Sequence, residues 1–127
     1  MGKYGEAAVL AVDIIKNGGC NNAKEAWELA STEIFGKGTP SQLKGCPKNT
    51  FLGLCEEGLI KGIQPGYYTK SQKNKAYALE AVELLKSNPL LASDAIKLWQ
   101  LVMNGADKNY NYQMDVVTML WNNGYII

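Results

Sequence analysis

The chain of 127 residues contains no histidine and no arginine, and all 13 of its basic residues are lysine. Without histidine, a Ser-His-Asp triad, a Cys-His pair and a histidine metal ligand are all excluded. Without arginine, no planar guanidinium can hold a phosphate, a carboxylate or a guanine through two parallel hydrogen bonds. We therefore expect none of these catalytic classes, and we interpret the protein as non-enzymatic.

Cysteine is scarce as well, and Cys20, Cys46 and Cys55 are irregularly spaced. An odd number of cysteines is not a disulfide framework, and three thiols fall short of the four ligands of a structural zinc site. We expect reduced thiols in a cytoplasmic protein that holds no metal and no cofactor. No segment reaches the roughly 20 apolar residues that cross a membrane, so a membrane is not an expected partner.

Apolar residues are nevertheless plentiful, at 46%, while charged residues make up 20% and the net charge is +1. This balance is typical of a folded globular chain rather than a disordered one. Its length fits a single domain over residues 1–127.

Apolar residues recur at helical spacing in six segments, and no run of alternating β-branched residues predicts a sheet. Start and stop signals separate the segments, because asparagine, serine and aspartate cap helices while glycine ends them. The first segment covers 8–15, and the second covers 23–34 behind Asn21 or Asn22. The other predicted starts are Pro47, in the first turn of the third helix, Thr69 or Ser71 for the fourth, Ser93-Asp94 for the fifth, and Asn109 or Asn111 for the sixth.

An internal repeat is the most informative pattern. Residues 11–16 resemble 81–86, and the glycine-stopped segment 54–60 resembles 120–126. Ala23 and Trp27 match Ala95 and Trp99, 72 positions later, so each copy of the repeat is expected to bury one tryptophan. The order is kept and the changes in offset fall in loops, which favours a true repeat over chance similarity between amphipathic helices. We predict an all-α fold of two pseudo-repeated three-helix units, about 4–60 and 71–127, joined by 61–70 in one compact domain.

Each three-helix unit resembles a helix-turn-helix, in which the third helix would be the recognition helix. The adjacent Glu56 and Glu57 and the absence of arginine disfavour binding to duplex DNA, which needs a basic face. A nucleic-acid-binding protein with helix-turn-helix-like units remains the alternative function.

The best local candidate for a binding site follows the irregular stretch that connects the two units. It combines two tyrosines with the closest spacing of lysines in the chain, just before a predicted helix N-terminus that would attract anions. We predict weak binding of an anion or a single-stranded base at Tyr67, Tyr68, Lys70, Lys73 and Lys75. The alternative is a solvated helix start whose tyrosines pack on the core.

Two other motifs are incomplete. The spacing of Asp107, Asn109 and Asn111 resembles a calcium loop, but Tyr112 replaces the turn glycine and Thr118 replaces the bidentate glutamate. A helix dipole at Cys46 would lower the pKa of its thiol, but no histidine is present to act as its base. The leading interpretation is therefore a small helical binding or interaction module, whose partner is a protein or a second copy of the chain; an enzyme without a recognisable motif comes third.

The stretches CPKNTFLGLCEEGLIKGI and YYTKSQKNKAYALEAVELL, within residues 46–85, resemble a small bacterial family known only as a domain of unknown function. The resemblance implies a standalone bacterial cytoplasmic protein. It implies no activity and no catalytic residue.

Overall fold

The computed structural model describes residues 2–127, and within that range the chain forms six α-helices and one 3-10 turn, with no β-strand. The predicted all-α fold of six helices is confirmed. The elements are α1 (Lys3–Lys16), α2 (Ala23–Phe35), α3 (Gly45–Glu56), α4 (Gln72–Ser87), η1 (Pro89–Ser93), α5 (Ala95–Met103) and α6 (Gln113–Asn122). The turn η1 was not predicted. None of the helices in the described range is long and apolar enough to cross a membrane.

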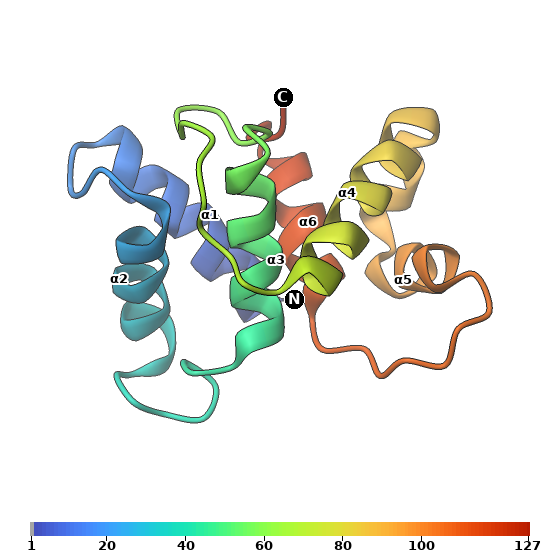
Figure 1. Ribbon diagram of the computed structural model, residues 1–127, viewed down its shortest axis with the longest axis horizontal. Helices are drawn as coiled ribbons and strands as arrows, with labels where there is room; N and C mark the ends of the chain where they lie inside the picture. Colours follow the sequence, from blue (N-terminus) through green and yellow to red (C-terminus); the bar gives the residue numbers. More distant parts are fainter. Residues whose placement is uncertain (1) are drawn as a thin grey trace.

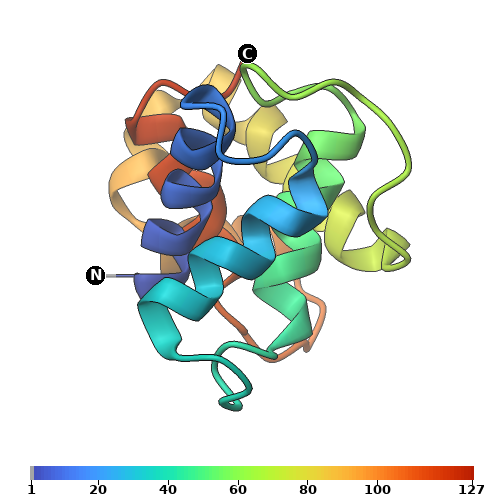
Figure 2. The same cartoon turned by 90° about the vertical axis from the view of Figure 1, so that its left-hand side faces the viewer.

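Helices α3 and α6 lie in the middle of the molecule, with α1 and α2 on one side and α4 and α5 on the other (Figure 1). Helix α1 packs against α2 and α6, while α4 packs against α3, α5 and α6. Seen from the side, α2 crosses in front of α1 and α3 (Figure 2). Each outer helix pair therefore covers the central pair from one direction, and the buried apolar side chains of all six helices form one continuous core.

The two central helices expose very little of their own surface. Within α3 only Gly45 is exposed, and within α6 only Asn122 is exposed. A recognition helix must present a long free face to enter a DNA groove. The burial of α3 and α6 therefore leaves neither helix a long exposed face of this kind.

Three predicted helix starts are correct in detail. Asn22, Ser71 and Asp94 each precede a helix, and each side chain accepts a hydrogen bond from the backbone N–H three residues further on. These bonds satisfy backbone donors that a helix leaves free in its first turn. The first helix starts earlier than predicted, at Lys3, because Tyr4 extends its buried stripe by a further turn.

The predicted start of the sixth helix is wrong. Neither Asn109 nor Asn111 caps α6, which begins at Gln113. The backbone at Tyr112 has φ of 68°, outside the helical region, and the side chain of Gln113 accepts a hydrogen bond from the N–H of Asn111 at 2.8 Å. The two asparagines therefore belong to the loop that precedes the helix.

The C-terminal ends of α3 and α6 are closed in the same way and meet each other. The N–H of Leu59 donates to the carbonyl of Leu54 at 3.1 Å, and the N–H of Tyr125 donates to the carbonyl of Leu120 at 3.0 Å. Both are the long bond of a Schellman cap, which needs a positive φ that glycine adopts cheaply. The glycines are Gly58 and Gly124, at φ of 73° and 75°.

Beyond these caps the two chain segments exchange a reciprocal pair of hydrogen bonds. Lys61 N–H donates to the Tyr125 carbonyl at 2.9 Å, and Ile127 N–H donates to the Leu59 carbonyl at 2.8 Å. The pair forms an isolated antiparallel bridge centred on Ile60 and Ile126. This bridge ties the end of α3 to the end of α6.

Trp27 and Trp99, which the repeat predicted to be core residues, are 1% and 6% exposed. We expect replacement of either residue by alanine to lower the free energy of unfolding by roughly 3–5 kcal/mol, because each indole would leave a large cavity. Urea unfolding followed by circular dichroism measures the loss. The half-buried Trp121 is the control and should lose less when changed to alanine. A loss below about 1 kcal/mol at Trp27 or Trp99 would contradict this assignment.

Candidate anion-binding site

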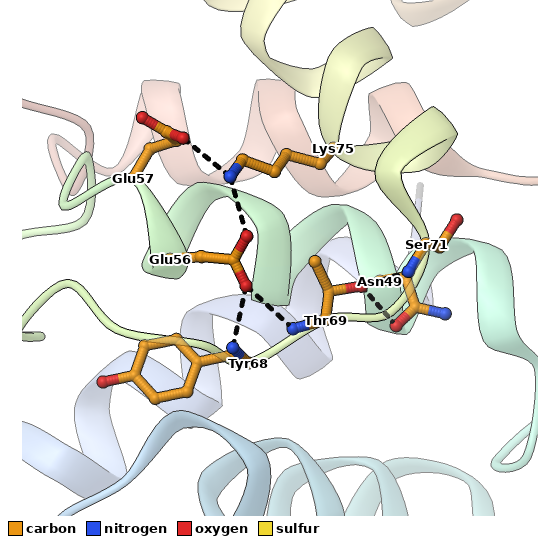
Figure 3. Close-up of polar contacts among 7 residues, drawn as sticks. All are labelled: Asn49, Glu56, Glu57, Tyr68, Thr69, Ser71 and Lys75. Atoms are coloured by element: carbon orange, nitrogen blue, oxygen red, sulfur yellow. Dashed lines mark hydrogen bonds and ion pairs between the residues drawn. The ribbon is translucent and has the colours of Figure 1, made fainter.

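The candidate site surrounds the segment between α3 and α4, residues 58–71, which we call the strap. The strap leaves the top of α3, runs down beside that helix and enters α4 (Figure 1). One carboxylate holds its second half in place. Oε1 of Glu56 accepts hydrogen bonds from the backbone N–H of Tyr68 at 2.8 Å and of Thr69 at 3.1 Å, as Figure 3 shows.

A second set of bonds continues from this point to the start of α4 (Figure 3). The hydroxyl of Thr69 donates to the side-chain oxygen of Asn49 at 2.8 Å and accepts from the N–H of Ser71 at 3.1 Å. An irregular stretch can leave backbone donors free for a ligand. Here the N–H groups of Tyr68 and Thr69 donate to Glu56 and that of Ser71 donates to Thr69, so these three donors are not free.

The other oxygen of Glu56 lies 2.7 Å from the ammonium of Lys75, which also contacts Glu57 at 2.6 Å. The side chains of Lys75 and Glu56 are only 14% and 9% exposed, so water screens their attraction weakly. The hydrogen bond from Lys75, with those from Thr69 and Tyr68, lowers the pKa of Glu56 from 4.5 to about 2. The two carboxylates in turn raise the pKa of Lys75, so both partners stay charged at neutral pH.

The five residues predicted to bind a ligand have different surroundings in the structure. Lys75 is paired with two glutamates and offers no free charge to a ligand. Tyr67 is 96% exposed, and Lys70 and Lys73 are exposed too. Tyr68 is half-buried, and its hydroxyl donates to the carbonyl of Gln64 at 2.7 Å. Lys70 and Lys73 border two different depressions, one on each side of the start of α4.

The first of these, which we call the lysine depression, lies where α2, α3 and the strap meet. Its charged residues are Lys24 of α2, Lys48 of α3 and Lys70 of the strap, and Asn49 and Tyr68 also line it, together with Leu52. None of the described residues that line it is acidic. Among residues 2–127, Lys75 forms ion pairs, and none of these three lysines does. The depression therefore concentrates positive charge beside polar and aromatic side chains.

Sequence reasoning found Tyr68 and Lys70 but missed Lys24, Lys48 and Asn49. The missing residues lie at least 19 positions earlier in the chain, and nothing in their local pattern distinguishes them from other surface residues. They join the site because α2, α3 and the strap pack together. The pairing of Lys75 with Glu56 was also missed, since 19 residues separate the two partners.

Other reactive groups do not assemble into a site. Within residues 2–127 no three His, Cys, Asp or Glu side chains lie close enough together to hold a metal ion. Burial raises the pKa of the Cys55 thiol far above its usual range, which makes that cysteine unreactive. Cys46 is half-buried at the start of α3.

We expect Glu56→Gln to lower the free energy of unfolding at neutral pH by roughly 1.5–3 kcal/mol, the range for hydrogen bonds to charged groups. Since the folded state lowers the pKa of Glu56 to about 2, this stabilisation is complete above 4.5 and is lost as the pH falls towards 2. The difference between the wild type and the variant should therefore shrink over that range. Urea unfolding at a series of pH values measures it.

Glu57→Gln is the matched control, because it removes the same charge from the neighbouring residue. The side chain of Glu57 is 44% exposed and, within the described residues, its carboxylate has Lys75 as its partner. An exposed ion pair contributes about 0–1 kcal/mol, so this variant should be close to the wild type. Equal losses in the two variants would show that Glu56 does not hold the strap.

The comparison with protein families matches residues 1–127, the whole chain, to one described as a family of unknown function (DUF6979). The resemblance found over residues 46–85 is thus confirmed and extends to the full length. Neither the comparison with curated proteins nor that with solved structures gave a match. The chain belongs to the DUF6979 family, a family of unknown function.

Proposed function

We propose that the protein is a non-enzymatic binding module whose lysine depression holds a phosphate group of a small ligand or of a single-stranded nucleic acid. The observation that carries the proposal is the convergence of Lys24, Lys48 and Lys70, from three separate segments, around a depression without an acidic lining residue. Three like charges repel one another, so an anion between them relieves that repulsion.

The chemistry of the lysine side chain sets the expected strength of binding. An ammonium is a strongly hydrated point charge and not a planar fork, so it grips phosphate without fixing its orientation. Lys24 and Lys70 are exposed, and salt screens exposed charges. We therefore expect weak, salt-sensitive binding with little sequence preference. Tyr67 directly precedes Tyr68, which lines the depression, and its highly exposed ring offers a face on which a base could stack.

The pKa shifts of Glu56 and Cys55 are not those of catalytic groups. A general acid at neutral pH needs a carboxyl group whose pKa is raised, whereas the pKa of Glu56 is lowered to about 2. A nucleophilic cysteine needs a lowered pKa, whereas burial raises that of Cys55. Both groups stabilise the fold: Glu56 holds the strap and Cys55 packs in the core.

The same structure supports an origin of the chain by internal duplication. The caps of α3 and α6 use equivalent residues 66 positions apart, and the reciprocal bonds between Leu59, Lys61, Tyr125 and Ile127 connect equivalent positions. Helix α1 packs on α6 as α4 packs on α3, so α1 and α4 each contact the central helix of the other half. We infer two three-helix units, about 4–60 and 71–127, whose central helices are related by an approximate two-fold axis.

We expect the double change Lys48→Glu and Lys70→Glu to weaken phosphate binding at least about tenfold, because it places two negative charges in the depression. The probes are inorganic phosphate and a single-stranded oligothymidylate, each titrated at low and physiological salt by calorimetry or fluorescence anisotropy. Binding of the oligothymidylate but not of phosphate would identify nucleic acid as the source of the phosphate group.

The matched control is Lys86→Glu with Lys97→Glu, which changes the net charge equally at exposed positions of α4 and α5. Lys75→Glu is unsuitable, because it would place a third carboxylate against Glu56 and Glu57 and disrupt the strap. No binding of either probe at low salt, or equal losses in the test and control pairs, would overturn the proposal.

A further inference from the structure

The second depression is bordered by the start of α4 and by the loop that joins α5 to α6. That loop projects at the lower right of Figure 1. Four of the residues that line the depression carry a side-chain carboxamide: Asn74, Asn109, Asn111 and Gln113. We call it the carboxamide pocket. None of the described residues that line it is acidic, and its volume is about 240 Å³.

Two of these carboxamides are buried and fixed. Asn74 and Gln113 are 9% and 3% exposed, and Nε2 of Gln113 donates to Oδ1 of Asn74 at 3.3 Å. Nδ2 of Asn74 donates to the hydroxyl of Ser71 at 3.0 Å, and Oε1 of Gln113 accepts from the N–H of Asn111 at 2.8 Å. Each amide nitrogen carries two hydrogens, and among residues 2–127 each has one protein acceptor. One hydrogen of each amide therefore has no protein acceptor among the described residues.

Aromatic rings form the apolar side of the pocket. Trp99 and Tyr77 both line it, with ring centroids 5.4 Å apart and nearly perpendicular planes. Tyr110 packs against Trp99 at 5.5 Å, and its hydroxyl, hydrogen-bonded to the carboxylate and the N–H of Asp115, fixes the loop on α6. The aromatic side is thus preorganised, which lowers the entropic cost of binding a planar ligand.

Two lysines complete the lining. Lys73 and Lys108 are both exposed, and within the described chain neither takes part in an ion pair. Fixed donors and acceptors, aromatic rings and cations at the rim match the three parts of a nucleotide. Carboxamides pair with the hydrogen-bonding edge of a base, aromatic rings contact its face, and ammonium groups attract its phosphate.

We propose that the carboxamide pocket binds a nucleotide, with the base against Asn74, Gln113 and the aromatic rings and the phosphate at Lys73 and Lys108. The pocket is small beside the roughly 300–1,000 Å³ of drug-sized sites, which suits a single base and not a larger cofactor. The proposal does not rest on the lysine depression, because the two sites share no lining residue.

Cys46 provides a direct readout, since it lines the carboxamide pocket and Cys55 is fully buried. In a Cys20→Ser variant, Cys46 is the accessible thiol, and a bound nucleotide should slow its alkylation by iodoacetamide. The probes are adenosine 5′-monophosphate, ribose 5-phosphate and a short single-stranded oligodeoxyadenylate. We expect saturable protection by adenosine 5′-monophosphate, about tenfold at saturation, and little protection by ribose 5-phosphate, which lacks the base.

Two exposed lining residues test the assignment without disturbing the core. In the same background, Lys73→Ala and Asn109→Ala should each weaken protection several-fold, whereas Lys86→Ala, at an exposed position of α4 that lines neither depression, should leave it unchanged. Protection by the oligodeoxyadenylate alone would assign the nucleotide to a nucleic-acid strand. No protection by any probe, equal protection by ribose 5-phosphate, or an equal effect of Lys86→Ala would overturn the proposal.

Discussion

The carboxylate of Glu56 fixes the strap to α3 and to the start of α4. It accepts hydrogen bonds from two successive backbone N–H groups of the strap and from the ammonium of Lys75 at the start of α4. A partly buried carboxylate with three such donors stays ionised, so the contact persists over the ordinary pH range. Because the strap is held there, Lys70 borders the same depression as Lys24 and Lys48.

The same contact explains the distribution of charge on the surface. Glu56 and Glu57 pair with Lys75, which lies in the first turn of α4. Lys70 and Lys73 take no part in this ion pair, and each of them borders one of the two depressions. With α3 and α6 buried, binding surfaces are left to loops and helix starts. Function concentrates in such segments when a rigid scaffold holds them.

Sequence patterns predicted most of the fold because the signals for it are local. Asn22, Ser71 and Asp94 bond to backbone groups three residues away, so a cap can be recognised without knowledge of the tertiary structure. The start of the sixth helix was misplaced because more than one asparagine is a possible cap. In the structure the side chain of Gln113 accepts a hydrogen bond from the N–H of Asn111, and the helix starts at Gln113. Periodicity alone does not rank such competitors.

The candidate site was less predictable, because its contacts join distant segments. Tyr68 and Lys70 stand out in the sequence, but no local pattern shows that Lys24 and Lys48 lie beside them. Nor does the sequence show that Lys75 forms an ion pair with Glu56, 19 residues earlier. Clusters of charge in a sequence indicate candidates, and packing decides which of those charges remain available to a ligand.

The most direct measurement compares phosphate binding by Glu56→Gln and Glu57→Gln at low salt and neutral pH. Both variants lose one negative charge, so electrostatics alone would strengthen binding equally in the two. If Glu56 holds the strap and thereby assembles the lysine depression, Glu57→Gln should bind at least as tightly as the wild type and Glu56→Gln more weakly. Equal or tighter binding by Glu56→Gln would contradict this account.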